Sequence, residues 1–192
     1  MKQLLITGFE PFGEHRINPS WEAVQLLPEE IGDYRLTKLC IPTVYEEAAR
    51  MVLDAAARIG ADVILCVGLA AGREAITPER IAVNIRDARL ADNQGRLCSG
   101  EMIDPEGPAA YFSTLPLERI VEAIRQQQIP AAISNSAGTY VCNDVLYTVL
   151  RHYEGSDVRC GFIHVPRISI QEKPNLPLMA LVRALIIAIT AL

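Results

Sequence analysis

The sequence predicts an α/β protein, a three-layer α/β/α sandwich with an open, mostly parallel and twisted sheet. Short runs rich in Val, Ile and Leu alternate with longer segments whose apolar residues recur at helical spacing. Neither an internal repeat nor a low-complexity linker interrupts the alternation. Strand followed by helix, several times over, implies right-handed crossovers between parallel strands and helices on both faces of the sheet. We therefore expect one domain over residues 1–192.

The strands are predicted from apolar runs that end in, or are followed by, Gly, Pro or Ser. They cover residues 3–7, 34–42, 62–68, 131–134 and 159–166. The helices are predicted from segments with apolar positions at helical spacing. They cover residues 18–30, 44–60, 116–128, 142–153 and 177–192.

Residues 72–115 break the alternation and predict a small hairpin excursion. The stretch 82–95 is typical of a strand that turns at 92–95, and the residues after it are loop-like, with Pro and Gly at short intervals. In open α/β sheets, ligands bind beyond the carboxyl ends of the strands, so the loops that leave those ends should border one crevice. These are the loops after residues 7, 42, 68, 134 and 165.

Composition excludes several classes of partner. Half of the 192 residues are hydrophobic, which is ample for a packed core. The net charge is −5 and the Lys and Arg residues are scattered, so neither nucleic acid nor an anionic membrane is an expected partner. The N-terminus lacks the long apolar segment of a secretory signal, which favours the cytoplasm.

The C-terminal segment and the cysteines also argue for a compact intracellular protein. The apolar stretch 178–192 is interrupted by Arg183 and is shorter than the ~20 residues that span a bilayer, so we expect a buried helix, part of whose face could form an oligomer contact. Five cysteines at irregular spacing, without C-x-x-C, argue against a disulfide framework or a zinc ribbon. Reduced thiols are expected.

Cys142 differs from the other cysteines in its setting. A turn of small residues, 134–138, leaves a predicted strand, and a helical pattern begins at Cys142. The N-terminus of a helix carries partial positive charge and free N–H donors, which favour a thiolate and can bind an oxyanion. We therefore expect Cys142 to be an ionised nucleophile; the alternative is a small buried hydrophobe.

A nucleophilic thiol needs a base, and the chain has three histidines. His15 lies in a charged loop, where a surface role is expected, and His152 ends a predicted helix, where a capping role is expected. His164 instead interrupts the apolar run 159–166 at the carboxyl end of a predicted central strand, where a polar group must be hydrogen-bonded or functional. His164 is therefore the candidate base, with a satisfied core histidine as the alternative.

Glu79 is the candidate for a third partner, because a carboxylate usually holds the tautomer of a catalytic imidazole. It follows Pro78 and precedes an apolar alternating segment near the predicted crevice. A surface ion pair with Arg80 is the alternative.

The first loop carries two glycines and two aromatic rings. Gly8 and Gly13 have the spacing of a phosphate-binding loop, but a Glu and a His follow where that motif requires Lys and Ser or Thr, so nucleotide binding is not expected. Phe9 and Phe12 either line an apolar pocket or pack beneath the loop.

Several segments, in this order, resemble the pyroglutamyl peptidase type I family, the pyrrolidone-carboxylate peptidases. They are TGFEPFG with NPSW, VGLAAGREAITPERIAVNIRDARLADNQG, SNSAGTYVCN and GFIHVP, between residue 4 and about residue 166. In that family a catalytic triad is formed by the Glu of P-E-R-x-A-x-N, the Cys of S-A-G-x-[FY]-x-C and the His of F-I-H-x-P. The resemblance places these roles on Glu79, Cys142 and His164.

The resemblance implies a cytoplasmic, cofactor-free and metal-free cysteine peptidase, an open α/β/α sandwich that is commonly a homotetramer. It implies removal of an N-terminal pyroglutamyl residue from small peptides. The lactam ring would lie between Phe9 and Phe12, and Arg89 would lie near the thiol and assist the oxyanion. Further substrate neighbours implied by the resemblance are Asn18, Thr43, Leu69, Tyr140 and Val141.

The chain departs from the family pattern after residue 166. The family continues there with an aromatic residue and a P-E-Q segment, whereas this chain has RISIQEKPNLPLM and a short tail. We therefore expect residues 167–192 to differ in their loop, helix and oligomer contacts. Tyr140 and Leu90 replace residues that are Phe or Ile in some relatives, which would alter the outline of the pocket.

Three other functions are consistent with a sandwich of this kind. One is a non-catalytic module that binds a small metabolite at the carboxyl edge of the sheet, with ordinary reactivity at Cys142. Another is a nucleoside phosphorylase-like transferase, which rests on analogy of fold alone. A metal hydrolase is the weakest alternative, because no His or carboxylate pair has the spacing of zinc ligands.

Overall fold

The computed structural model describes residues 1–13, 16–173 and 175–192. Its central sheet has the strand order β2-β3-β1-β4-β8-β5. The strands are β1 (Lys2–Phe9), β2 (Glu30–Ile31), β3 (Tyr34–Ile41), β4 (Val63–Leu69), β5 (Thr77–Pro78) and β8 (Arg159–Val165). The pairs β1/β3, β1/β4 and β4/β8 are parallel, and the short edge strands β2 and β5 are antiparallel. The expected mostly parallel sheet is confirmed.

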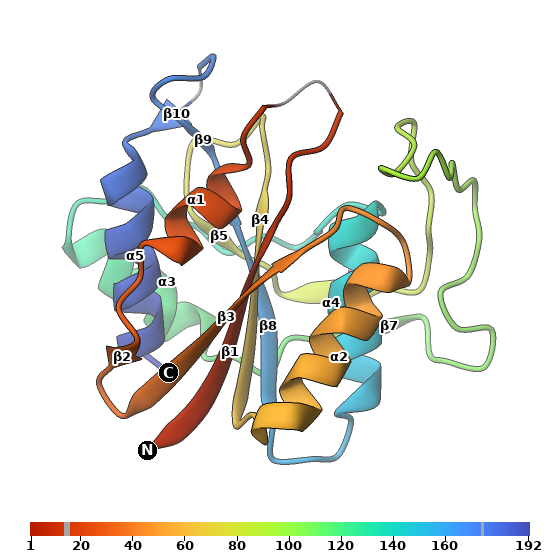
Figure 1. Ribbon diagram of the computed structural model, residues 1–192, viewed down its shortest axis with the longest axis horizontal. Helices are drawn as coiled ribbons and strands as arrows, with labels where there is room; N and C mark the ends of the chain where they lie inside the picture. The colour runs from red at the N-terminus through yellow and green to blue at the C-terminus, as the bar shows by residue number, and fades with distance from the viewer. Residues whose placement is uncertain (14–15, 174) are drawn as a thin grey trace.

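Helices cover both faces of this sheet, which makes three layers (Figure 1). The helices α1 (Pro19–Gln25), α3 (Leu117–Gln126) and α5 (Leu178–Thr190) lie on one face, and α2 (Glu47–Ile59) and α4 (Val141–His152) lie on the other. Each face has its own apolar cluster, and the inner strands contribute alternate residues to the two clusters. Strands buried on both faces explain why their sequences are nearly continuous apolar runs.

The C-terminal helix α5 is a core element. Leu181, Ala184, Leu185 and Ala188 are fully or almost fully buried, and the helix packs against α1 and α3. Arg183, which interrupts the apolar stretch, is exposed on the opposite side of the helix. None of the helices in the described part of the chain is long and apolar enough to cross a bilayer.

Two predicted elements are shorter than the sequence pattern indicates. The helix expected over 18–30 ends at Gln25, because Pro28 lacks a backbone N–H donor and residues 30–31 pair with β3 instead. Residues 131–134, expected as a strand, form only two isolated bridges, from Ala131 to Ile76 and from Ser134 to Glu79. The reason is that β5 takes the edge of β8, so residues 131–134 meet only the outer side of a two-residue strand.

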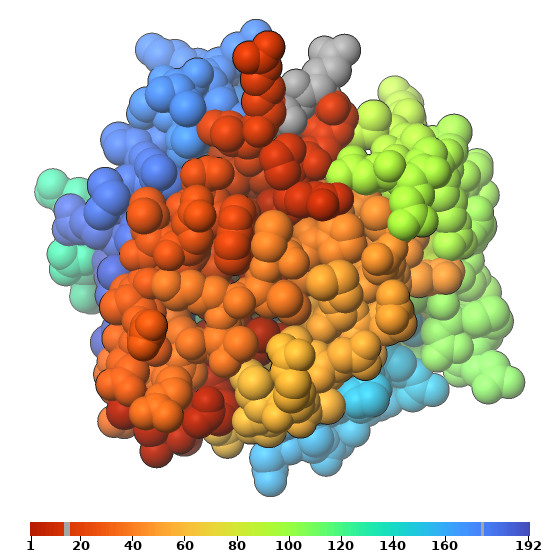
Figure 2. All heavy atoms as spheres, in the orientation of Figure 1, coloured from red at the N-terminus to blue at the C-terminus, as the bar shows by residue number. Residues whose placement is uncertain are grey.

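The excursion between β5 and α3 is a hairpin of a different kind from the expected one. The short strands β6 (Ile81–Val83) and β7 (Ala110–Phe112) pair in antiparallel fashion, so residues 84–109, here called the arm, form a long connection. The expected turn at 92–95 is present, with the Gly95 N–H donated to the carbonyl of Asp92 at 2.9 Å. The strand expected over 82–95, however, ends at Val83. Figure 2 shows the arm as a ridge along one side of the molecule, beside α2.

Residues after β8 form a small outlying unit. The two-residue strands β9 (Arg167–Ile168) and β10 (Asn175–Leu176) pair in parallel before the chain enters α5. His15, expected on the surface, lies outside the described residues.

A cavity in α5 should test its place in the core. Replacing Leu185, which is fully buried, with Ala should lower the free energy of unfolding by about 2–5 kcal/mol, because the neighbours of the lost methyl groups collapse only in part. Replacing the exposed Arg183 with Ala on the same helix should change it by less than about 0.5 kcal/mol. Urea unfolding followed by circular dichroism measures both, and equal losses would contradict this packing.

Candidate active site

The strand order produces a change of direction in the connections at the carboxyl edge of the sheet. The chain crosses from β1 to β3 through α1 on one face and returns from β3 to β4 through α2 on the other face. The loops that follow β1 and β4 therefore diverge, which is the topological switch point where α/β sheets bind ligands. β8 lies next to β4, so its carboxyl end borders the same edge.

His164 and Glu79 form the most tightly defined contact at this edge. His164 is the next-to-last residue of β8, and its Nδ1 lies 2.6 Å from Oε1 of Glu79. Both side chains are buried, at 4% and 0% exposure. Glu79 is brought there by β5, because its backbone N–H is donated to the carbonyl of Phe162 directly after the antiparallel pairing of Thr77 with His164. Since Glu79 holds Nδ1, Nε2 is the ring nitrogen available for proton transfer.

Cys142 lies on the same face of the sheet as His164. It is the second residue of α4, in the first turn, one residue later than the helix start. A Cβ placed on Gly68 would lie 3.1 Å from its Sγ and 2.7 Å from the ring of Phe162. Gly68 is the register partner of His164 on the neighbouring strand, and the rings of Phe162 and His164 are 4.7 Å apart. The thiol therefore occupies space left by a missing side chain beside the strand that carries the imidazole.

The surroundings of His164 and Glu79 lower the pKa values of both side chains, for different reasons. Burial lowers the pKa of His164, against the hydrogen bond and charge of Glu79, which raise it. Burial alone would raise the pKa of Glu79, but the hydrogen bond and charge of His164, with Ser134 and Arg73, outweigh burial and hold that pKa below its usual range. At neutral pH the pair is therefore a neutral imidazole beside an ionised carboxylate.

The thiol is not ionised in the resting protein, which corrects the expectation of a preformed thiolate. Burial, with a smaller contribution from the negative charge of Glu79, raises the pKa of Cys142 to about 12, although Arg73 and the backbone N–H of Cys142 itself act in the opposite sense. Desolvation of the thiolate thus outweighs the field of the first helical turn. A nucleophilic role for Cys142 would therefore require a base that takes its proton.

Arg73 is a site residue that the sequence reasoning missed. Its Nη1 lies 2.5 Å from Oε1 of Glu79, and its Nη2 is donated to the carbonyl of Ser136 at 2.9 Å. The available signal was position: Arg73 follows β4 in one of the loops expected to border the crevice.

The arm holds the start of α4 in place. The side chain of Asn143 accepts from the Val83 N–H and donates to the carbonyls of Val83 and Ile85. The buried Asp144 accepts from Nε of Arg86 at 2.7 Å. Arg86 is therefore an arginine of this segment that contacts α4. Arg89, which the resemblance places near the thiol, is exposed and forms no ion pair with a described carboxylate.

The aromatic residues expected around a substrate have different surroundings. Phe9 is buried at 2% exposure, with its ring 6.2 Å from that of Phe162. Phe12 lies instead near Tyr140, with ring centroids 6.2 Å apart, and the Tyr140 hydroxyl is donated to the carbonyl of Ala91 in the arm. Phe12 and Tyr140 therefore form a partly exposed aromatic pair, and Tyr140 directly precedes the helix that carries Cys142.

The remaining expected residues shape the loops of the crevice. Asn18 caps α1 by accepting from the Ser20 N–H, and its Nδ2 is donated to the carbonyl of Glu10 in the first loop. The buried Thr43 donates its hydroxyl to that same carbonyl at 3.4 Å. Leu69 ends β4, and Val141 is buried at the first position of α4.

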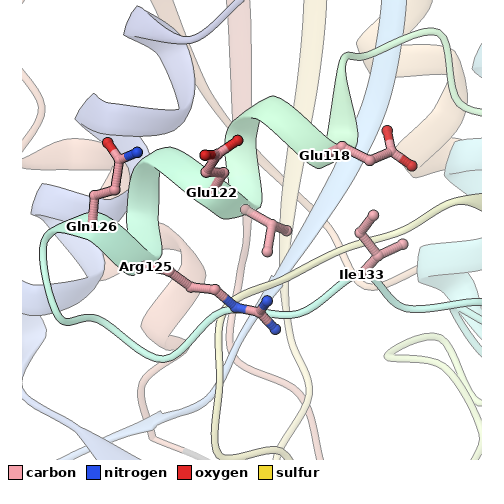
Figure 3. A pocket seen from close by; sticks show the side chains of 6 residues that line it. Glu118, Glu122, Arg125, Gln126 and Ile133 are labelled. Carbon is pink, nitrogen blue, oxygen red and sulfur yellow. The ribbon is translucent and has the colours of Figure 1, made fainter.

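Neither a metal centre nor a disulfide is formed in the described part of the chain. No group of three His, Cys, Asp or Glu residues there could hold a metal ion, and all five cysteines are free. A separate open hollow of about 720 Å³ lies on α3, away from Cys142 and His164 (Figure 3). It is lined by Glu118, Val121, Glu122, Arg125, Gln126 and Ile133.

Comparison with known proteins identifies relatives along the whole chain. A family model described as pyroglutamyl peptidase matches residues 2–192. A pyrrolidone-carboxylate peptidase of Staphylococcus saprophyticus is 47% identical over 183 residues, covering 93% of this chain and 86% of that protein. One from Brachyspira hyodysenteriae is 46% identical over 179 residues, covering 91% and 89%.

Solved structures agree with this match. The crystal structure of pyroglutamyl peptidase I from Bacillus amyloliquefaciens has a TM-score of 0.95 at 41% identity and covers 100% of this chain and 96% of that chain. The pyrrolidone carboxyl peptidase from Thermococcus litoralis has a TM-score of 0.95 at 36% identity, covering 100% and 93%. The family match also includes residues 167–192, so the divergent tail does not lie outside the family's limits.

The protonation state of Cys142 can be measured by alkylation. Because the thiol has a raised pKa, its rate of reaction with iodoacetamide should climb about tenfold per pH unit between about pH 6 and 9. Mass spectrometry of the peptide that contains Cys142 separates this thiol from the other four, and the Cys142→Ser variant is the control. A plateau beginning below pH 7 would show a preformed thiolate instead.

Proposed function

The chain belongs to the pyroglutamyl peptidase family, and we propose that it removes N-terminal pyroglutamyl residues from small peptides with Cys142, His164 and Glu79 as its catalytic triad. The observation that carries the proposal is the buried 2.6 Å contact between His164 and Glu79, beside a thiol lodged against Gly68. A cysteine, an imidazole and an orienting carboxylate are the parts that acyl transfer through a thioester requires.

The proposed reaction begins with a neutral thiol. Nε2 of His164 accepts the proton of Cys142 as the sulfur attacks the carbonyl carbon between pyroglutamate and the next residue. Glu79, held on Nδ1, stabilises the imidazolium that forms. Collapse of the tetrahedral intermediate breaks the C–N bond, and the imidazolium donates its proton to the leaving amine.

The second half of the reaction releases the acid. Water, losing its proton to the neutral His164, attacks the thioester carbonyl, and the departing sulfur recovers a proton from the imidazolium. The first turn of α4 supplies backbone N–H groups near the sulfur for the oxyanion, with Arg89 as a further candidate. One such donor typically contributes ~2.7–4 kcal/mol to lowering the barrier.

Specificity in this proposal comes from the uncharged lactam. Pyroglutamate has no α-ammonium group, so an apolar site with a few lactam hydrogen bonds accepts it. Glutamine at the N-terminus would bury an unpaired charge in the same site. Phe12 and Tyr140, which are partly exposed, are proposed to contact the lactam, and the buried Phe9 is proposed to support that side of the site from the core. Asn18, Thr43, Leu69 and Val141 are proposed to border it.

We also propose one domain over residues 1–192, a cytoplasmic location and a homotetramer. A reducing compartment suits a mechanism that needs a free Cys142 thiol. Exposed apolar side chains on α5 and before it, Met179 at 59% and Ile170 at 82% exposure, suit contacts between subunits.

A set of fluorogenic reporters tests the proposed activity. Under reducing conditions, pyroglutamyl-aminomethylcoumarin should be cleaved at least about 100-fold faster, in kcat/KM, than the glutaminyl and prolyl reporters, because only the lactam is both cyclic and uncharged. Similar rates on all three would contradict the specificity argument, and the absence of cleavage would contradict the activity.

Variants of the triad belong to the same experiment. Cys142→Ala should lose about 10⁴-fold or more of kcat, and His164→Ala nearly as much, whereas the loss in Glu79→Gln should be about 10- to 100-fold smaller than in Cys142→Ala, because an orienting group contributes less than the nucleophile. Thermal unfolding midpoints check that each variant is folded. Full activity of Cys142→Ala would end the mechanism.

The space beside Gly68 gives an independent test. In Gly68→Ala the added methyl group would press on the Phe162 ring and on Cys142 Sγ, so kcat/KM should fall about 100-fold, equivalent to about 2.7 kcal/mol of barrier. Gly72→Ala is the matched control, because a Cβ there meets nothing within 4 Å. Unchanged activity in a folded Gly68→Ala variant would show that the thiol does not use this space.

A further inference from the structure

Arg73 contacts both Glu79, which holds His164, and the loop that leads to Cys142. It lies in a turn after β4, where its N–H is donated to the carbonyl of Ala70. Its side chain is 28% exposed, so most of it is buried. One arm of the guanidinium, Nη1, contacts Oε1 of Glu79, and the other, Nη2, donates to the carbonyl of Ser136.

The contact with Glu79 restricts the carboxylate. Oε1 receives both Nδ1 of His164 and Nη1 of Arg73, whereas Oε2 is buried and has no hydrogen-bond partner among the described residues. Rotation about the last torsion of a glutamate is soft, so a single contact from the imidazole would leave the carboxylate plane loosely defined. A second donor on the same oxygen, from a planar guanidinium, fixes that plane.

The contact with Ser136 acts on the nucleophile. Ser136 lies six residues before Cys142 in the loop that enters α4, and its Oγ accepts the N–H of Gly138 at 3.2 Å. Gly138 has φ of +76°, which a side chain would strain, so the path of this loop is closely defined. Holding the carbonyl of Ser136 therefore helps to place the first turn of α4.

We propose that Arg73 is a positioning residue for the triad, which ties the carboxylate that orients His164 to the loop that carries Cys142. The proposal rests on the proposed function, because it assigns a role within that reaction. Arg73 does not need to touch the substrate. Its role is to keep the imidazole, which is carried by β8, and the thiol, which is carried by α4, in the relative position that proton transfer requires.

The charge of Arg73 provides a readout that packing alone would not move. Arg73 lowers the pKa of His164, and it lowers the pKa of Cys142 as well. Within the described part of the chain, the other charged or titratable groups that act on these two are Glu79, on both, and Cys66, on the thiol. Removing the charge should therefore raise both pKa values. Since His164 must be neutral to accept a proton, the acid limb of kcat/KM should move to higher pH.

The test compares three variants of the full chain. In Arg73→Gln, kcat should fall about 10- to 100-fold with KM within about threefold, as expected for misplaced catalytic groups, and the acid limb should move upward. Arg73→Lys keeps the charge but cannot bridge both acceptors, so its acid limb should stay near that of the wild type while kcat remains reduced.

Arg80→Gln is the matched control. Arg80 contacts the same loop, donating to Oδ1 of Asn135, and it pairs with Glu118 on α3. Its ion pair leads away from Glu79, so both kcat and the acid limb should be unchanged in this variant. Thermal midpoints of all variants accompany the kinetics.

Two outcomes would overturn the proposal. One is an Arg73→Gln variant with wild-type kcat and acid limb. The other is a loss that is equal at every pH and equal in Arg73→Lys, which would show a merely structural role. If the wild type does not cleave the pyroglutamyl reporter, the proposed function fails instead. Iodoacetamide alkylation of Cys142, which needs no substrate, still reports on Arg73: its rate at a given pH should be lower in Arg73→Gln and near wild type in Arg73→Lys.

Discussion

The buried contact between Glu79 and His164 is the constraint on which the rest of the site depends. A carboxylate with no exposure must be compensated, because an unpaired buried charge is costly. The fold provides that compensation by ending its sheet with an antiparallel two-residue strand, β5, which turns Glu79 back toward β8. A strand parallel to β8 at this edge would run in the direction opposite to that of β5, so the residue after it would not lie beside Phe162 as Glu79 does. The irregular edge of the sheet is thus what completes the acid–base pair.

The balance between burial and the field of the helix N-terminus sets the protonation state of Cys142. The start of α4 favours negative charge, but the thiol is packed against the sheet beside Gly68 and Phe162, and desolvation dominates. A neutral thiol is oxidised less readily than a thiolate would be. In the proposed mechanism, ionisation is coupled to attack on the substrate, when His164 receives the proton and Glu79 stabilises the resulting charge.

Rigidity at the start of α4 comes from outside the helix. Asp144, fully buried, accepts from Arg86 of the arm through Oδ1 and from the N–H of Glu46 through Oδ2. Glu46 has φ of +63°, in a tight three-residue turn in which the Glu47 N–H reaches the carbonyl of Tyr45 at 2.6 Å. Such a backbone persists only where neighbouring contacts hold it. The arm and the start of α2 therefore brace the turn that carries Cys142.

The sequence by itself determined the alternation of strands and helices, the identity of the core helices and the candidates Cys142, His164 and Glu79, because hydrophobic periodicity and residue chemistry are local properties. Tertiary structure decided the rest. Whether residues 131–134 pair as a strand depended on β5 occupying the edge of β8, and the role of Arg73 depended on two loops meeting in space. The protonation of the thiol likewise follows from burial, which is a sum over neighbours from distant segments and cannot be read from any single stretch of chain.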